Sequence, residues 1–195
     1  MGPIAGADAA SFRLLKDGYA ADAALAYFWG KPFAVRDVAS FEVLDYGFTR
    51  DHVRAYNRTT EIADSDGASF AAVDLEHAKD ATHVWFTYLD DDPKTGRMRA
   101  AARSIIGVDV TSFEGKTNGY AVDAKHVYYQ GHAISSSTAG FEYLSLSYAK
   151  SASEVFYDGK KIRGANAATF TMMQPASDQA DASDSEGKYL NGRRV

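Results

Sequence analysis

The sequence predicts an all-β fold made of about six tandem repeats of roughly 29 residues, each a β-hairpin or three-stranded unit, in a propeller-like ring or an open β-solenoid. Three observations predict it. A pattern of aspartate and aromatic residues recurs along nearly the whole chain. The 12 Tyr and 11 Phe among the 195 residues are types that favour strands. Glycine repeatedly follows a short run of β-branched and aromatic residues, which is a hairpin signal.

The repeat is defined by fixed spacings from an aspartate, here called position 0. An aromatic residue follows at +5, often a glycine at +8, a bulky apolar residue at +11 and a phenylalanine at +19. The first complete copy consists of Asp22, Tyr27, Gly30, Phe33 and Phe41.

Four further copies keep this order. They are Asp51, Tyr56, Ile62 and Phe70; Asp80, Trp85, Ile105 and Phe113, with fourteen extra residues; Asp123, Tyr128, Gly131, Ile134 and Phe141; and Ser151, Phe156, Gly159, Ile162 and Phe170. Asp184, Tyr189, Gly192 and Val195 form the first half of a sixth copy, and Ile4 and Phe12 form the second half. Such a split copy favours a ring closed by its first and last strands, with an open solenoid as the alternative.

These spacings predict a single repeat domain over residues 1–195. Its parts are a half-copy 1–15, copies 16–44, 45–73, 74–116, 117–145 and 146–173, an acidic linker 174–187 and a closing half-copy 184–195, which overlaps the end of the linker. The linker is predicted to be mobile because it is rich in Ser, Asp, Ala and Gln.

Each copy is expected to contain about three short strands. In 127–134, β-branched and aromatic residues lead into Gly131 and then Ile134, as in a hairpin. A stretch of small residues such as 164–169 suits a turn, and alternation in 41–44 predicts a further strand. If buried, each +19 phenylalanine contributes about 2–3 kcal/mol.

The segments 120–129 and 155–165 carry the pattern best, and they resemble the bacterial DKNYY repeat family, named for an Asp-Lys-Asn-Tyr-Tyr signature. The resemblance covers nearly the whole chain. It implies a bacterial protein, commonly of the envelope, with no established catalytic residues. No catalytic residue can therefore be carried over to this sequence.

The charge and composition of the chain argue against several classes of binding partner. The formal charge of −5 disfavours general binding to nucleic acid or anionic membranes, and no apolar run approaches the roughly 20 residues of a membrane span. The N-terminus lacks the pattern of a signal segment, but the chain opens within a repeat, which leaves the envelope or periplasm and the cytoplasm as open alternatives.

No cofactor, metal or catalytic residue is predicted. The repeated aspartates could be imagined as metal ligands, but an aspartate before a strand commonly accepts backbone N–H groups in a turn, and we predict that role. The histidines show no ligand spacing and are expected on strand surfaces: His52, His77, His83, His126 and His132.

The insertion in the third copy is the least repeat-like surface, and we predict that it forms a hairpin with a polar tip rather than a calcium loop. Either it is a tolerated decoration or it contacts a partner. The candidate partner-binding residues are Tyr88, Asp90, Asp91, Asp92, Lys94, Arg97 and Arg99.

The expected function is non-catalytic binding of another protein, most concretely as an immunity protein that neutralises a secreted bacterial toxin. The alternative is a carbohydrate-binding or adhesion module of the cell surface, because repeated aromatic hairpins can stack on sugars. An enzyme is the least favoured class, since no catalytic motif is present.

Overall fold

The computed structural model describes all residues except 1–3, 5, 93–94 and 175–178. These described residues form six four-stranded antiparallel sheets and one 3-10 turn, η1 (Val38–Ser40). The predicted all-β repeat is confirmed. The chain divides into two compact units, Met1–Ile105 and Ile106–Val195, which are described separately.

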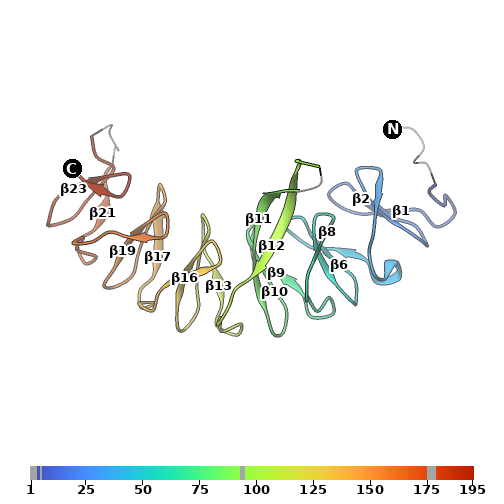
Figure 1. The fold of residues 1–195 in the computed structure, drawn as a ribbon, viewed down its shortest axis with the longest axis horizontal. Coiled ribbons are helices and arrows are strands. Elements are labelled where there is room, and N and C mark those ends of the chain that lie inside the picture. Colours follow the sequence, from blue (N-terminus) through green and yellow to red (C-terminus); the bar gives the residue numbers. More distant parts are fainter. Residues whose placement is uncertain (1–3, 5, 93–94, 175–178) are drawn as a thin grey trace. The chain divides into compact units, whose positions relative to one another are not determined.

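The N-terminal unit contains three sheets, each made of four consecutive strands (Figure 1). Their strands are β1 (Arg13–Leu14), β2 (Tyr19–Ala21), β3 (Ala26–Phe28) and β4 (Lys31–Phe33); β5 (Glu42–Val43), β6 (Phe48–Arg50), β7 (Ala55–Asn57) and β8 (Thr60–Ile62); and β9 (Ala71–Ala72), β10 (His77–Lys79), β11 (Val84–Asp91) and β12 (Met98–Ser104).

The C-terminal unit repeats this plan. Its strands are β13 (Glu114–Gly115), β14 (Tyr120–Val122), β15 (Val127–Tyr129) and β16 (His132–Ser135); β17 (Glu142–Ser145), β18 (Tyr148–Lys150), β19 (Val155–Tyr157) and β20 (Lys160–Lys161); and β21 (Thr171–Met172), β22 (Ala182–Ser183), β23 (Lys188–Leu190) and β24 (Arg193–Arg194). Each repeat thus supplies four strands. The prediction of three missed the strand directly before position 0, such as β14.

The closing half-copy completes its sheet within the C-terminal segment. Strand β23 pairs with β22 and β24, and β22 pairs with β21. The sheet that contains the half-copy 184–195 is therefore built from the strands that precede it in the chain, and not from the N-terminal half-copy. The prediction that this half-copy pairs with the N-terminal half-copy and so closes a ring is wrong.

The predicted linker is also partly wrong. Residues 175–178 lie outside the described residues, but Ala180, Asp181 and Ala182 are buried, and β22 begins at Ala182. Asp181 accepts a hydrogen bond from the Tyr148 hydroxyl at 2.8 Å and one from the Asn191 N–H at 2.9 Å. These contacts fold the second part of the segment.

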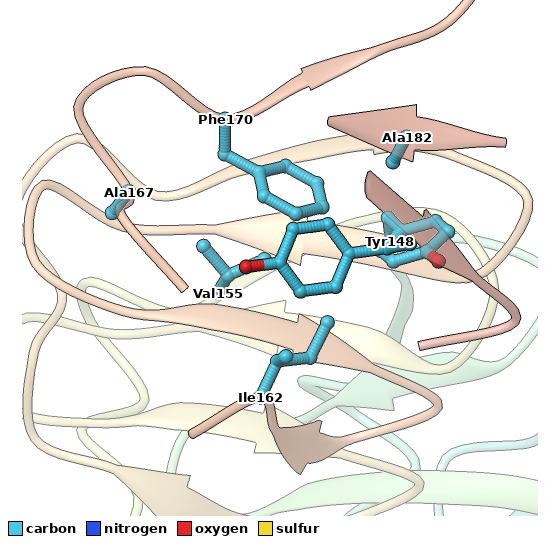
Figure 2. Close-up of a cluster of buried hydrophobic side chains, with 7 residues drawn as sticks. Tyr148, Val155, Ile162, Ala167, Phe170 and Ala182 are labelled. Carbon is cyan, nitrogen blue, oxygen red and sulfur yellow. The ribbon is translucent and has the colours of Figure 1, made fainter. Parts of the chain in front are cut away.

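Aromatic rings and aliphatic side chains fill the space between neighbouring sheets of one unit. Figure 2 shows one such cluster, in which the rings of Tyr148 and Phe170 lie side by side, with Val155 and Ile162 nearby. The centroids of the two rings are 5.5 Å apart. Among the +19 phenylalanines, burial is confirmed for Phe41, Phe70, Phe113 and Phe170, whereas Phe141 is half-buried.

Candidate functional site

The position 0 aspartates are bound by backbone and tyrosine donors. Asp22 accepts the N–H groups of Ala24 and Leu25 on Oδ1, at 2.8 and 2.7 Å. Its Oδ2 accepts the N–H of Asp8 at 3.0 Å and the hydroxyl of Tyr27 at 2.6 Å. A buried carboxylate with four donors stabilises the turn, which confirms the predicted structural role.

The same contacts recur in other copies. In four further copies the carboxylate accepts the N–H groups of the residues two and three positions later. These carboxylates belong to Asp51, Asp80, Asp123 and Asp184. Where the +5 residue is tyrosine, its hydroxyl donates to the same aspartate. In the fifth copy Ser151 replaces the aspartate and Phe156 replaces the tyrosine, so the hydroxyl donor is absent, while the Ser151 hydroxyl still accepts the N–H groups of Ser153 and Glu154.

A second turn signal was missed in the sequence. Asp8, Asp37, Asp66 and Asp109 each lie fourteen residues before position 0 and donate their N–H to its carboxylate. Each begins the pattern Asp-x-x-Ser-Phe. The serine hydroxyl accepts the N–H of the residue after position 0, as Ser40 does from His52 at 3.0 Å. This pattern, visible in the sequence, joins one turn to the next.

These contacts predict acid sensitivity. The Tyr27 hydroxyl, followed by the Asp8 and Ala24 N–H groups, holds the pKa of Asp22 well below its ordinary value. For Asp51, Asp80, Asp123 and Asp184, burial raises the pKa, but the hydrogen bonds outweigh it and the pKa is lowered. In the unfolded chain these carboxyls titrate near 3.8.

Because the folded-state pKa is the lower one, the stabilisation is present above about pH 4 and is lost as the pH falls through the folded values. We expect the urea midpoint to change little between pH 7 and 5 and to fall steadily below pH 4. In the Asp123→Asn variant this fall should be shallower. A wild-type midpoint that stays constant down to pH 2.5 would contradict the prediction.

The insertion forms a two-stranded hairpin, as predicted. β11 pairs with β12 from Trp85↔Ser104 to Asp91↔Met98. The tip is closed by the Asp92 N–H donating to the Arg97 carbonyl at 2.9 Å and the Gly96 N–H donating to the Asp92 carbonyl at 2.7 Å. The polar tip is thus a hairpin turn.

The hairpin brings together some of the candidate partner-binding residues. Asp90 lies opposite Arg99, and Asp91 lies opposite Met98. Asp92 and Arg97 close the turn, and Lys94 lies outside the described residues. Asp90, Asp91, Arg97 and Arg99 are exposed.

One face of the hairpin carries an aromatic stack, of which only Tyr88 was predicted as a candidate partner-binding residue. The rings of Phe86 and Tyr88 are stacked, with centroids 6.3 Å apart and planes at 9°. The Arg103 guanidinium lies 4.3 Å from the Tyr88 ring centroid, in a cation–π contact. Tyr88 is therefore half-buried under an arginine, which stiffens the base of the hairpin.

The opposite face carries apolar residues that the sequence analysis missed. Leu89 is 56% exposed and Met98 is 61% exposed. Together with turns of neighbouring strands, Leu89 borders a groove of about 330 Å³, whose lining also includes Tyr46, Arg58, Leu75 and Ala100. Tyr46 and Leu75 are both more than half exposed. Bulky apolar residues within tight turns were the signal that could have found this groove.

The histidine prediction is wrong in two respects: His77 is not on a surface, and His52, His83 and His126 lie in the turns before β7, β11 and β15 and not on strands. His77 is fully buried, with Nδ1 at 3.0 Å from the Asp74 carboxylate and its ring 5.5 Å from that of Phe86. It takes the place that Tyr19, Tyr120 and Tyr148 hold three residues before position 0 in other copies. His52 and His132 are exposed, and His83 and His126 are half-buried. The part of the chain that the structure describes contains no group of three His, Asp or Glu side chains able to hold a metal ion.

Three other results bear on function. Among the described residues, no helix is long and apolar enough to cross a membrane. The model of the DKNYY family matches residues 19–140, more than half of the chain. No curated protein and no solved structure matches the chain.

Proposed function

The chain belongs to the DKNYY family, and we propose that it is a non-catalytic repeat protein that binds another protein through the β11–β12 hairpin. The observation that carries the proposal is the exposed apolar face of this hairpin, on which Leu89 and Met98 are exposed and Leu89 borders the groove lined by Tyr46 and Leu75. Clustered exposed apolar side chains edged by charged ones are typical of protein-binding surfaces.

The regular part of the repeat supports the same proposal. The recurring residues of the repeat are used in turns and in packing, as Asp123 and Tyr128 illustrate. The hairpin is the element that departs from the repeat, so it is the best candidate for a surface particular to this protein.

In its most specific form, the proposal makes the protein an immunity protein that blocks a secreted bacterial toxin. A net charge of −5 and a sequence without catalytic motifs support this form. An acidic surface suits a basic partner and speeds its encounter.

Carbohydrate binding is the second proposal. One observation argues against the version in which each repeat offers an equivalent aromatic ring for stacking on a sugar. The +5 rings of Tyr27, Tyr56, Tyr128, Phe156 and Tyr189 are at most 1% exposed, so they are not available as equal stacking sites for sugars. Trp29, which is 65% exposed, remains available as an aromatic platform. Glycan binding that is lost in Trp29→Ala would support this alternative.

The binding proposal is tested by shortening the hairpin. Residues 88–101 are replaced by a two-residue Gln-Gly turn, which is the turn that joins β15 and β16. A partner is captured from the native host with the wild-type protein, purified, and its Kd measured for both proteins. We expect at least a tenfold weaker Kd for the shortened protein, because the exposed Leu89 and Met98 are removed.

The control is Leu146→Ser, which removes an exposed leucine in the C-terminal unit and should leave the Kd unchanged. Unaltered binding by the shortened protein would reject the hairpin as the binding element.

A further inference from the structure

The groove beside the β11–β12 hairpin has a wall made by one face of that hairpin. Alternate pairs of the ladder share this face, and from base to tip they are Trp85–Ser104, Thr87–Ala102, Leu89–Ala100 and Asp91–Met98. At the base, Trp85 and Ala102 belong to the apolar cluster that includes Phe48 of the preceding sheet. Strand β12 lies against β7 and β8, and the hairpin extends past them (Figure 1). Its apolar face therefore rises above the turns of the preceding sheet.

Turns of the N-terminal unit form the floor of the groove. Tyr46 lies between β5 and β6, Arg58 between β7 and β8, and Leu75 between β9 and β10. The volume of about 330 Å³ is at the low end of the range for ligand pockets. It suits one bulky side chain with its adjoining backbone, and not a whole helix.

Arg58 supplies the positive charge of the groove. It is exposed, and among the described residues its guanidinium forms no ion pair. The other two arginines of the same copy, Arg50 and Arg54, each pair with a glutamate. Glu76 also lines the groove, but it forms no ion pair with Arg58. A carboxylate brought into the groove would therefore complete the charge of Arg58, and guanidinium groups bind carboxylates with well-defined geometry.

The backbone of the floor holds bulky residues in a conformation that disfavours them. Tyr46 and Arg58 have φ angles of +58° and +56°. Asparagine takes such angles with less strain, and Asn118 and Asn191 occupy the corresponding positions in copies of the C-terminal unit. Strained residues are typical of binding sites, and here both bulky side chains line the same groove.

We propose that the groove receives a segment of the partner protein in which a bulky apolar residue lies next to a carboxylate. The apolar side chain packs between Leu89 and Tyr46, and the carboxylate pairs with Arg58. This inference rests on the proposed function, since it names the chemistry that the hairpin surface recognises. The partner as a whole is expected to be basic, so this carboxylate is a local feature that fixes the orientation of the bound segment.

The first test uses N-acetylphenylalanine as a probe, because it carries a carboxylate next to an aromatic ring. N-acetylphenylalaninamide, which has the same bulk without the charge, is the control. Titrations are followed by the backbone amide signals in NMR spectra. We expect a Kd at least fivefold lower for the acid than for the amide, with the largest shifts at Leu75, Leu89 and Ala100. Equal Kd values, no binding, or shifts confined to other residues would overturn the inference.

The second test removes the charge of the groove without straining the turn. Arg58→Asn copies the residue that the chain itself has at Asn191, so the urea midpoint should not fall. We expect this variant to bind the acid and the amide equally, whereas Arg58→Lys, which keeps the charge, should retain the preference for the acid. Lys31→Gln removes an exposed charge outside the groove and should change neither Kd. A preference for the acid that persists in Arg58→Asn would show that Arg58 does not bind the carboxylate.

The partner captured from the host distinguishes the failure of this inference from that of the proposed function. If hairpin shortening weakens its binding but Arg58→Asn and Tyr46→Asn do not, the groove is not the recognition site and the binding function stands. We expect each of these two variants to weaken the Kd about tenfold. If hairpin shortening has no effect on that partner, the proposed function is wrong and this inference falls with it.

Discussion

Replacing Asp123 with alanine is expected to lower the free energy of unfolding by about 4 kcal/mol, because one buried donor and three partly buried donors lose their acceptor at once. Asp123 is 3% exposed. It accepts the Lys125 and His126 N–H groups and the Asp109 N–H, each at 2.7 Å, and the Tyr128 hydroxyl at 2.7 Å. The alanine side chain has no acceptor for any of these four donors.

The chain itself offers the matched control. In the fifth copy, Ser151 and Phe156 occupy the places of Asp123 and Tyr128, and the Ser151 hydroxyl bonds to that of Ser137 at 3.0 Å. Tyr128→Phe alone should cost about 1 kcal/mol, the net value of one hydrogen bond. Asp123→Ser combined with Tyr128→Phe should cost less than the sum of its two single substitutions, because the second removes a donor that the first leaves unsatisfied.

Urea unfolding at pH 7, followed by circular dichroism, measures all four variants. A destabilisation below about 1 kcal/mol for Asp123→Ala would show that water replaces the carboxylate in this turn. Strict additivity of Asp123→Ser and Tyr128→Phe would contradict the pairing of the two side chains.

The sequence predicted those features of the fold that local chemistry determines. A repeated aspartate before a strand, followed at +5 by an aromatic residue, indicated a turn and a buried ring, and Asp22 and Tyr27 show both. The hairpin of the insertion also followed from its own residues, because a polar tip separates two strand-like segments.

The features that were missed depend on residues distant in sequence. The segment after Gln174 has the composition of a linker, but Asp181 is buried because the hydroxyl of Tyr148, 33 positions earlier, donates to it. The short strand β14 pairs with both β13 and β15, and its Tyr120 reaches a carbonyl of Ser147 in the next sheet. The composition of a segment does not indicate hydrogen-bond partners that lie far away in the sequence.

The candidate site was predicted in position but not in character. The prediction named Asp90, Arg97 and Arg99 because the insertion is rich in charged residues. The apolar face with Leu89 and Met98 can be identified only from the pairing register of β11 and β12. Turn residues of other strands complete the groove, and no local pattern in the insertion indicates them.

Contacts between neighbouring sheets lead to the second large effect, at Gly159. This residue has φ +70°, and an added Cβ would lie 2.3 Å from Cδ1 of the Tyr129 ring. The Tyr120 hydroxyl also accepts the Gly159 N–H at 2.8 Å, so the turn is held in place from the preceding sheet. Gly159→Ala should therefore lower the free energy of unfolding by about 3 kcal/mol, combining left-handed backbone strain with overpacking.

Gly164→Ala separates these two causes. Gly164 has nearly the same conformation, φ +77°, but nothing lies within 4 Å of an added Cβ. Its substitution should cost only the backbone strain, about 1 kcal/mol. The remaining cost at Gly159 is steric, and it should shrink when Tyr129→Ala removes the opposing ring. Equal losses for Gly159→Ala and Gly164→Ala in urea unfolding would mean that Tyr129 moves aside freely, so that the ring would not fix the spacing of the two sheets that it joins.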